Sequence, residues 1–194
     1  MKIRIANLIS NTLNPFLAGM ITILIICLES TSSIPDALRW ALIATGLSML
    51  PIFLVVIYLV IKGRVDSVFA NSRRQRTTIY WASLGLAAID CVVLWLLGAP
   101  YSLVISFLVA LIAGTIFMII NFWWKISLHT ASITTLVVVL VILFGYFALI
   151  STLVIPIVMW SRVALRHHTL LQTLVAALLV PLIIVPLFMA FGLT

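Results

Sequence analysis

Long uninterrupted apolar runs constrain this chain more than any other feature. A transmembrane helix needs about 20 consecutive apolar residues, and candidate spans cover residues 14–28, 38–61, 79–97, 101–122 and 170–191. Hydrophobic residues make up 65% of the 194 residues and charged residues only 8%, whereas soluble domains carry roughly 25% charged residues. The sequence therefore predicts an all-α, polytopic integral membrane helical bundle and excludes a soluble globular domain.

Residues 131–160 admit more than one interpretation. A single helix of this length would measure about 45 Å, which exceeds a hydrocarbon core of about 30 Å. We expect a hairpin that turns near Gly145, with arms of about 17 residues, the lower limit for a span. This gives seven transmembrane helices, or six if part of the region is re-entrant. Residues 1–194 are expected to form one transmembrane domain.

Basic residues gather on one expected side of the membrane. On the seven-span interpretation, all three histidines and ten of the eleven Lys and Arg residues lie there; only Arg39 lies on the other side. The ten are Lys2, Arg4, Lys62, Arg64, Arg73, Arg74, Arg76, Lys125, Arg162 and Arg166. The positive-inside rule places this side in the cytoplasm, so we expect a multi-pass protein of the cell membrane.

These cations have two explanations. Topology and contact with anionic lipid headgroups account for most basic loops in membrane proteins. Residues that bind phosphate would instead be selected for chemistry, although Lys2 and Arg4 indicate the same orientation independently. We expect membrane lipids as partners and no nucleic acid.

The segment before the last span carries the strongest chemical pattern. His168 lies near the expected N-terminus of this helix, and Gln172 lies one turn later on the same face. A helix N-terminus attracts anions through its N–H groups and dipole, and Arg162 offers a planar, permanently charged fork suited to phosphate. An imidazole beside an anion site, oriented by a partner, suits a nucleophile.

Two further segments fall on the same face. Lys125, Ser127 and His129 supply a cation, a hydroxyl and a second imidazole that could protonate a leaving oxygen. Arg73 and Arg76 supply guanidinium groups, and phosphoryl transfer depends mostly on positioning and charge stabilisation. No His, Cys, Asp or Glu cluster has metal-ligand spacing, so we expect neither a metal nor a cofactor.

Together these segments resemble the type 2 phosphatidic acid phosphatase family, within the wider acid phosphatase and haloperoxidase fold. The family motifs are KxxxxxxRP, PSGH and SRxxxxxHxxxD. Ser161, Arg162 and His168 match the Ser, Arg and His of the third motif. Ser127 and His129 match the second motif in part.

Several motif positions depart from the family pattern. Ile126 and Leu128 replace the proline and glycine of the second motif. In the first motif, Arg76 followed by Thr77 stands for Arg-Pro, and Phe69 falls where the lysine should be. The resemblance covers a phosphatase-like core over about residues 64–194, preceded by two extra N-terminal spans.

The resemblance implies a metal-independent phosphatase mechanism. His168 would attack phosphorus to form a phosphohistidine, and His129 would protonate the leaving oxygen. The residues implied in phosphate binding are Arg162, Arg76, Ser127, Lys125, Arg73 and Ser161. The implied substrate is an amphiphilic lipid phosphate or polyprenyl diphosphate.

Gln172 stands where the family has the aspartate that orients the nucleophile. A glutamine accepts the same hydrogen bond but adds no negative charge, and losing such a charge costs about 10⁴-fold in serine proteases. The alternative is therefore a catalytically weak or inactive phosphatase-like subunit of a larger membrane complex. A transporter or channel fits less well, because beyond Asp90 no row of polar residues follows the spans. Asp90, inside the third span, is expected to bond to a neighbouring helix or to pair with Arg39.

Overall fold

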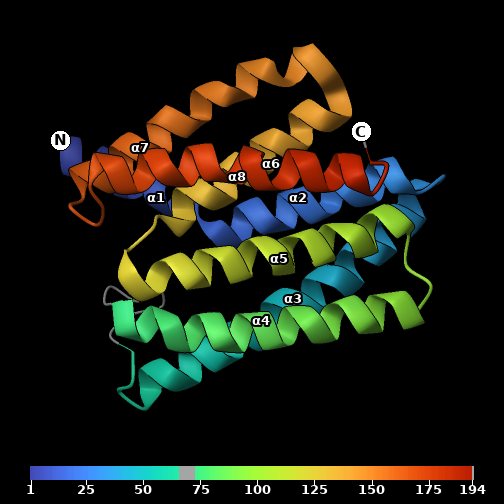
Figure 1. The fold of residues 1–194 in the computed structure, drawn as a ribbon, viewed down its shortest axis with the longest axis horizontal. Coiled ribbons are helices and arrows are strands. Elements are labelled where there is room, and N and C mark those ends of the chain that lie inside the picture. The colour runs from blue at the N-terminus through green and yellow to red at the C-terminus, as the bar shows by residue number, and fades with distance from the viewer. Residues whose placement is uncertain (66–72, 194) are drawn as a thin grey trace. The chain divides into compact units, whose positions relative to one another are not determined.

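The computed structural model describes residues 1–65 and 73–193, and every regular element in this part of the chain is a helix (Figure 1). Among the described residues, six helical runs are long and apolar enough to cross a membrane. They are Lys2–Ser30, Ile34–Ile61, Gln75–Leu96, Tyr101–Trp123, Leu128–Ala164 and Leu170–Ala190. The predicted all-α polytopic membrane bundle is therefore confirmed.

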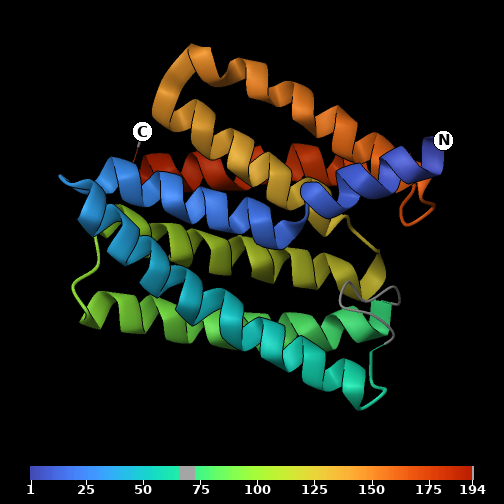
Figure 2. The same cartoon turned by 180° about the vertical axis from the view of Figure 1, so that it is seen from behind.

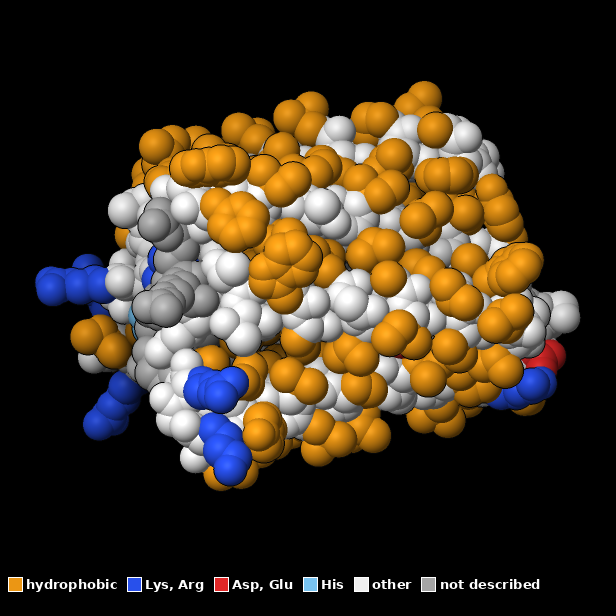
Figure 3. Space-filling model, turned by 60° about the horizontal axis from the view of Figure 1, so that its bottom comes forward, with side chains coloured by type: hydrophobic (Ala, Val, Ile, Leu, Met, Phe, Trp, Pro, Cys, Tyr) orange, Lys and Arg blue, Asp and Glu red, His pale blue; other side chains and the backbone are white. Residues whose placement is uncertain are grey.

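The surface of the helices is that of a protein embedded in lipid. Figure 3 shows hydrophobic side chains over most of the face in view and only a few Lys and Arg side chains. Leu42, Ile89 and Leu182 are among many large apolar side chains that are exposed in the interior of helices. Soluble monomers rarely expose apolar patches of this extent to water. A protein surrounded by the hydrocarbon core of a bilayer can expose them without that cost.

The helices form two compact units. Unit 1 comprises Met1–Thr22 and Lys125–Thr194, and unit 2 comprises Ile23–Trp124. The elements of unit 1 are α1 (Lys2–Thr12), the first part of α2 (Pro15–Ser30), α6 (Leu128–Phe144), the 3₁₀ helix η1 (Gly145–Leu153), α7 (Val154–Ala164) and α8 (Leu170–Ala190). Unit 2 contains the rest of α2 with α3 (Ile34–Ile61), α4 (Arg73–Leu96) and α5 (Tyr101–Trp123). A phosphatase-like core that starts near residue 64 stays a prediction.

A short helix, α1, precedes the first predicted span and packs on α7 (Figure 2). It ends before Asn14 and Pro15, because the residue before a proline disfavours helical backbone and proline fits the first turn of a new helix. Asn14 caps α2 by accepting the Leu17 N–H at 2.9 Å. The buried face of α1 presents Ala6 and Ser10, one turn apart.

Gly145 reverses the chain between α6 and its return arm. Its φ of 64° and ψ of −146° suit only a residue without Cβ. Beyond it, η1 and α7 fold back along α6 (Figure 1), so the apolar run 128–164 consists of two arms. The predicted hairpin near Gly145 is thus present, and α6, with 17 residues, meets the lower limit for a span.

In unit 2, α4 and α5 form a tight antiparallel hairpin. The turn uses Gly98 with a φ of 73°. A Cβ at Gly114 would lie 2.9 Å from Cδ2 of Leu84, so the glycine leaves room for the Leu84 side chain where the two helices pack. At the far end of the hairpin, the Asn121 amide donates to Thr77 Oγ1 at 3.2 Å.

Asp90 lies on α4 and is 3% exposed. Arg39 is exposed near the start of α3, and its guanidinium lies 5.4 Å from the centroid of the Trp40 ring. Among the described residues neither side chain forms an ion pair, so the pairing considered from sequence is not formed. The cation–π contact leaves the Arg39 head in solvent and avoids the cost of burying it.

Candidate functional site

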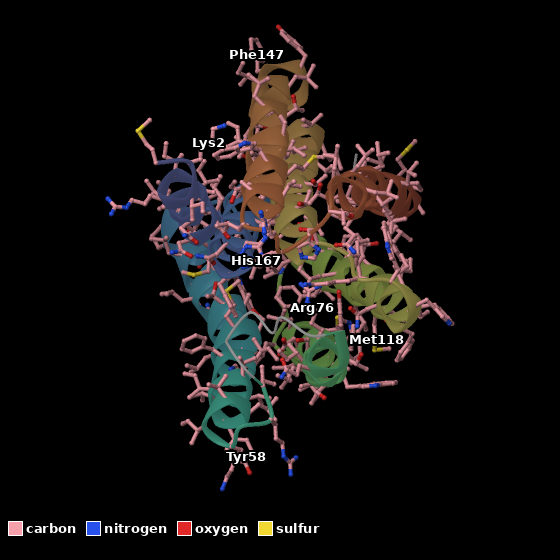
Figure 4. All side chains as sticks on the ribbon, turned by 90° about the vertical axis from the view of Figure 1, so that its left-hand side faces the viewer. Lys2, Tyr58, Arg76, Met118, Phe147 and His167 are labelled. Carbon is pink, nitrogen blue, oxygen red and sulfur yellow. The ribbon has the colours of Figure 1, made fainter. Side chains whose placement is uncertain are left out.

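One end of unit 1 gathers most of the predicted site residues. This end contains the start of α1, the segment before α6, the end of α7 and the loop into α8. Figure 4 looks onto it, with Lys2 on α1 and His167 in the α7–α8 loop labelled. All five basic residues of unit 1 occur in these segments, namely Lys2, Arg4, Lys125, Arg162 and Arg166.

No carboxylate side chain of unit 1 opposes these cations. The residues of unit 1 include no Asp or Glu, and the described acidic residues Glu29, Asp36 and Asp90 belong to unit 2. A cluster of cations without acidic partners produces a positive local potential. This end of unit 1 is therefore suited to an anion such as a phosphate group.

The loop between α7 and α8 is short and held by backbone hydrogen bonds. The Arg166 N–H donates to Val163 O at 2.9 Å, and the His167 N–H donates to Arg162 O at 3.1 Å. These two bonds form a Schellman motif, which closes the C-terminus of α7. Arg166 occupies its left-handed position with a φ of 56°, where glycine is usual. The loop thus enters α8 along a fixed path.

His168 and Gln172 contact each other across the first turn of α8. The Nδ1 atom of His168 lies 3.1 Å from Gln172 Oε1. The same oxygen accepts the Thr169 N–H at 3.2 Å, and the Thr169 hydroxyl accepts the Gln172 N–H at 3.3 Å. This reciprocal pair is a capping box.

The capping box determines which His168 nitrogen carries the proton. A backbone N–H can only donate, so the Gln172 atom that faces Thr169 must be the carbonyl oxygen. That oxygen can only accept, so the Nδ1 atom of His168 must donate to it. In the neutral ring, Nε2 then carries the lone pair that a nucleophile uses. The predicted orienting role of Gln172 therefore has a geometric basis.

Arg162 and Ser161 bond to α1. Nη1 of Arg162 donates to Ser10 Oγ at 2.5 Å, and the Ser161 hydroxyl donates to Ala6 O at 2.8 Å. All four residues are buried, so the end of α7 and the face of α1 form one closed contact. The predicted phosphate-binding arginine is thereby held by a residue from the other end of the sequence.

Lys125 connects the segment before α6 to the α7–α8 loop. Its Nζ donates to the carbonyl oxygen of His167 at 2.9 Å. The His167 side chain is half-buried, and His167 directly precedes His168 in the loop. Lys125 thus fixes the loop that carries His168, a positional role in addition to its predicted phosphate contact.

Ser127 and His129 start α6. Ser127 Oγ caps the helix by accepting the Thr130 N–H at 3.3 Å and the Thr130 hydroxyl at 3.0 Å. His129 follows in the first turn and is 3% exposed. Ser127 therefore has a structural task, and the second imidazole is enclosed by protein rather than turned to lipid.

Arg76 and Arg73 belong to unit 2. Arg76 is buried in the first turns of α4, beside the Thr77 that binds Asn121. Phe69 and the side chain of Arg73 lie outside the described residues. Convergence of these two arginines with the histidines stays a prediction.

Metal ligands do not come together in the described part of the chain, where no group of three His, Cys, Asp or Glu side chains could hold an ion. Cys27 is buried and Cys91 half-buried, and both are free thiols. The side chains present can hold an anion, accept a proton and donate one.

The contribution of α1 to the site is not evident from the apolar runs of the sequence. Residues 2–12 contain no long apolar run, and the length of an apolar run is the criterion for a span. A signal was nevertheless present, because Ala6 and Ser10 are small residues at helical spacing and Asn14-Pro15 is a helix boundary.

Comparison of the chain with models of protein families, with curated proteins and with solved structures gave no match.

Proposed function

We propose that this chain is a membrane phosphatase of the type 2 phosphatidic acid phosphatase kind, acting on a lipid phosphate or polyprenyl diphosphate. One observation supports this most strongly. Nδ1 of His168 donates its proton to Gln172 Oε1, and His168 belongs to the loop that follows α7, whose last turn carries the buried Arg162. The residues proposed as nucleophile, orienting group and anion-binding group therefore all belong to unit 1.

The proposed reaction has two steps. In the first, Nε2 of His168 forms a bond to phosphorus as the phosphorus–oxygen bond of the substrate breaks. His129 gives a proton to the departing oxygen, and Arg162, Ser127 and Lys125 stabilise the phosphoryl oxygens. In the second step water attacks phosphorus, the nitrogen–phosphorus bond breaks, and His129 takes up the proton of the water.

A lipid-bound substrate suits this site. The flanks of α1 and α8 expose apolar side chains, including Leu8 and Leu171, near the basic end of unit 1. An acyl or prenyl tail would stay in the hydrocarbon while the phosphate reaches the cations. Arg73 and Arg76 are the further phosphate ligands in this proposal.

The test is phosphate release from phosphatidic acid and from a polyprenyl diphosphate in detergent. Wild type should release phosphate without added metal, and His168→Ala should abolish the release and the phosphorylated protein. His167→Ala is the matched control, because it removes the adjacent ring and keeps the carbonyl that Lys125 binds. Activity that survives in His168→Ala would refute the mechanism.

A second function is favoured by a different observation. Arg162, Lys125, Ser127 and Ser161 all make hydrogen bonds to other groups of the protein, and Gln172 lacks the charge of an aspartate. A chain that keeps these contacts for stability alone would be a phosphatase-like subunit of a larger membrane complex. A stable larger assembly in mild detergent, with no phosphate release, would favour it.

We further propose the cell membrane as the location, with the basic end of unit 1 in the cytoplasm. Lys2 and Arg4, at the start of α1, support this orientation by the positive-inside rule.

A further inference from the structure

We propose that Ser10 of α1 is a positioning residue for Arg162, so that α1 completes the anion site. This inference rests on the proposed function and adds to it a residue outside every motif of the sequence. Ser10 and Arg162 are separated by 152 residues in the chain, and their hydrogen bond is buried.

The hydroxyl of Ser10 behaves differently from others in this protein. Thr12, Thr22 and Ser48 lie in helices and each donate to the carbonyl four residues earlier, at 2.8–2.9 Å. This is the usual bond of such residues in a helix. Ser10 instead accepts from Arg162.

Ser161 explains the difference. The carbonyl four residues before Ser10 belongs to Ala6, and the Ser161 hydroxyl donates to that oxygen at 2.8 Å. A carbonyl oxygen has two lone pairs, and the helical N–H of Ser10 uses the other. Ser161 thus occupies the acceptor that Ser10 would otherwise use. The two serines act as a pair, one from the third motif and one from α1.

The hydrogen bond to Ser10 limits the positions that the Arg162 guanidinium can take. Arginine has a long, flexible side chain, and a bond to Ser10 restricts it before any substrate arrives. Fixing a charged group in advance lowers the cost of binding an anion and of stabilising charge in the transition state.

The test is a double-mutant cycle with orthovanadate, which mimics the five-coordinate phosphorus of phosphoryl transfer. Vanadate affinity is measured by calorimetry for wild type, Ser10→Ala, Arg162→Ala and the double variant, beside kcat and KM for a lipid phosphate. Ser10→Cys keeps the size of the side chain if Ser10→Ala folds poorly. Thr12→Val is the control, because it removes a hydroxyl of α1 that bonds only to carbonyls of its own helix.

We expect Ser10→Ala and Ser10→Cys to weaken vanadate binding about 10-fold or more, as for other bonds to a charged group. Ser10→Ala should add less than about 2-fold to Arg162→Ala, because the two act as one unit. Thr12→Val should bind like wild type.

Two results would overturn the inference. One is a Ser10→Ala variant that binds vanadate as tightly as Thr12→Val does. The other is a loss of vanadate affinity from Ser10→Ala that is as large in the Arg162→Ala background as in the wild-type background. Vanadate binding with this coupling but without phosphate release would refute the phosphatase and leave the inference standing. A wild type that neither binds vanadate nor releases phosphate would refute both.

Discussion

Oε1 of Gln172 accepts two hydrogens, one from the Thr169 backbone at 3.2 Å and one from Nδ1 of His168 at 3.1 Å. One amide oxygen therefore caps α8 and orients the imidazole. In families with a catalytic triad a carboxylate orients the histidine and also stabilises its positive form. Gln172 provides the geometry without the charge.

Gln172→Glu should raise kcat, because glutamate has the same shape, preserves the capping box and adds the missing charge. We expect a gain of at least about 10-fold, with about 10⁴-fold as the upper bound suggested by serine proteases. Gln172→Asp should give a smaller gain, because its shorter side chain reaches Thr169 and His168 less well. Phosphate release measures both, and Gln172→Glu in a His168→Ala background should remain inactive. A glutamate variant no faster than wild type would show that charge is not what limits the rate.

His129→Ala should slow hydrolysis in proportion to the basicity of the leaving group. If His129 protonates the departing oxygen, a lipid alkoxide needs it and a nitrophenolate does not. We expect the first step, measured as formation of the phosphorylated protein, to slow about 10²-fold or more with phosphatidic acid and much less with p-nitrophenyl phosphate. Equal losses on the two substrates would assign His129 a structural role. His167→Ala serves as the control.

Arg166→Gly should stabilise the protein. The positive φ of 56° at Arg166 costs roughly 1 kcal/mol for a residue with a Cβ, and glycine removes that cost at the left-handed position. Glycine also loses more backbone entropy on folding, which offsets part of this gain, so the free energy of unfolding in detergent should rise by about 0.5–1 kcal/mol. Arg166→Ala removes the same charge and keeps the Cβ, so it should give no such gain. An equal rise in the free energy of unfolding in both variants would show that removing the positive charge, and not relieving the backbone, stabilises the protein.

Cysteine labelling should place Tyr146 and Arg166 on opposite sides of the membrane. They lie at the two ends of the arm formed by η1 and α7. In a chain with Cys27 and Cys91 replaced by alanine, an impermeant maleimide added to intact cells should label Tyr146→Cys and not Arg166→Cys. Labelling of both would show that the arm does not cross the membrane, and the reverse pattern would invert the proposed orientation.

The parts of the fold predicted from sequence are those that depend on local patterns. Apolar runs predict spans because hydrocarbon accepts no long polar segment, and a glycine between two such runs predicted the reversal at Gly145. The contact of His168 with Gln172 was also predictable, because residues four apart share a helix face.

The contacts of α1 and Lys125 were not predictable in the same way. Ser10 meets Arg162, and Lys125 meets the His167 carbonyl, only after distant helices have packed. Neither pair has a spacing that the sequence reveals. A buried serine on a short polar helix has no distinguishing pattern until its partner is known.

The five-residue loop between Ala164 and Leu170 is secured at both ends, by the Schellman motif of α7 and the capping box of α8. The groups that end one helix and begin the next thus also hold the imidazole in place. Many substitutions that disturb the ring would therefore unwind a helix end as well. Among substitutions in this loop that abolish phosphate release, we therefore expect far more that lower the amount of folded protein than that leave the protein well folded and inactive.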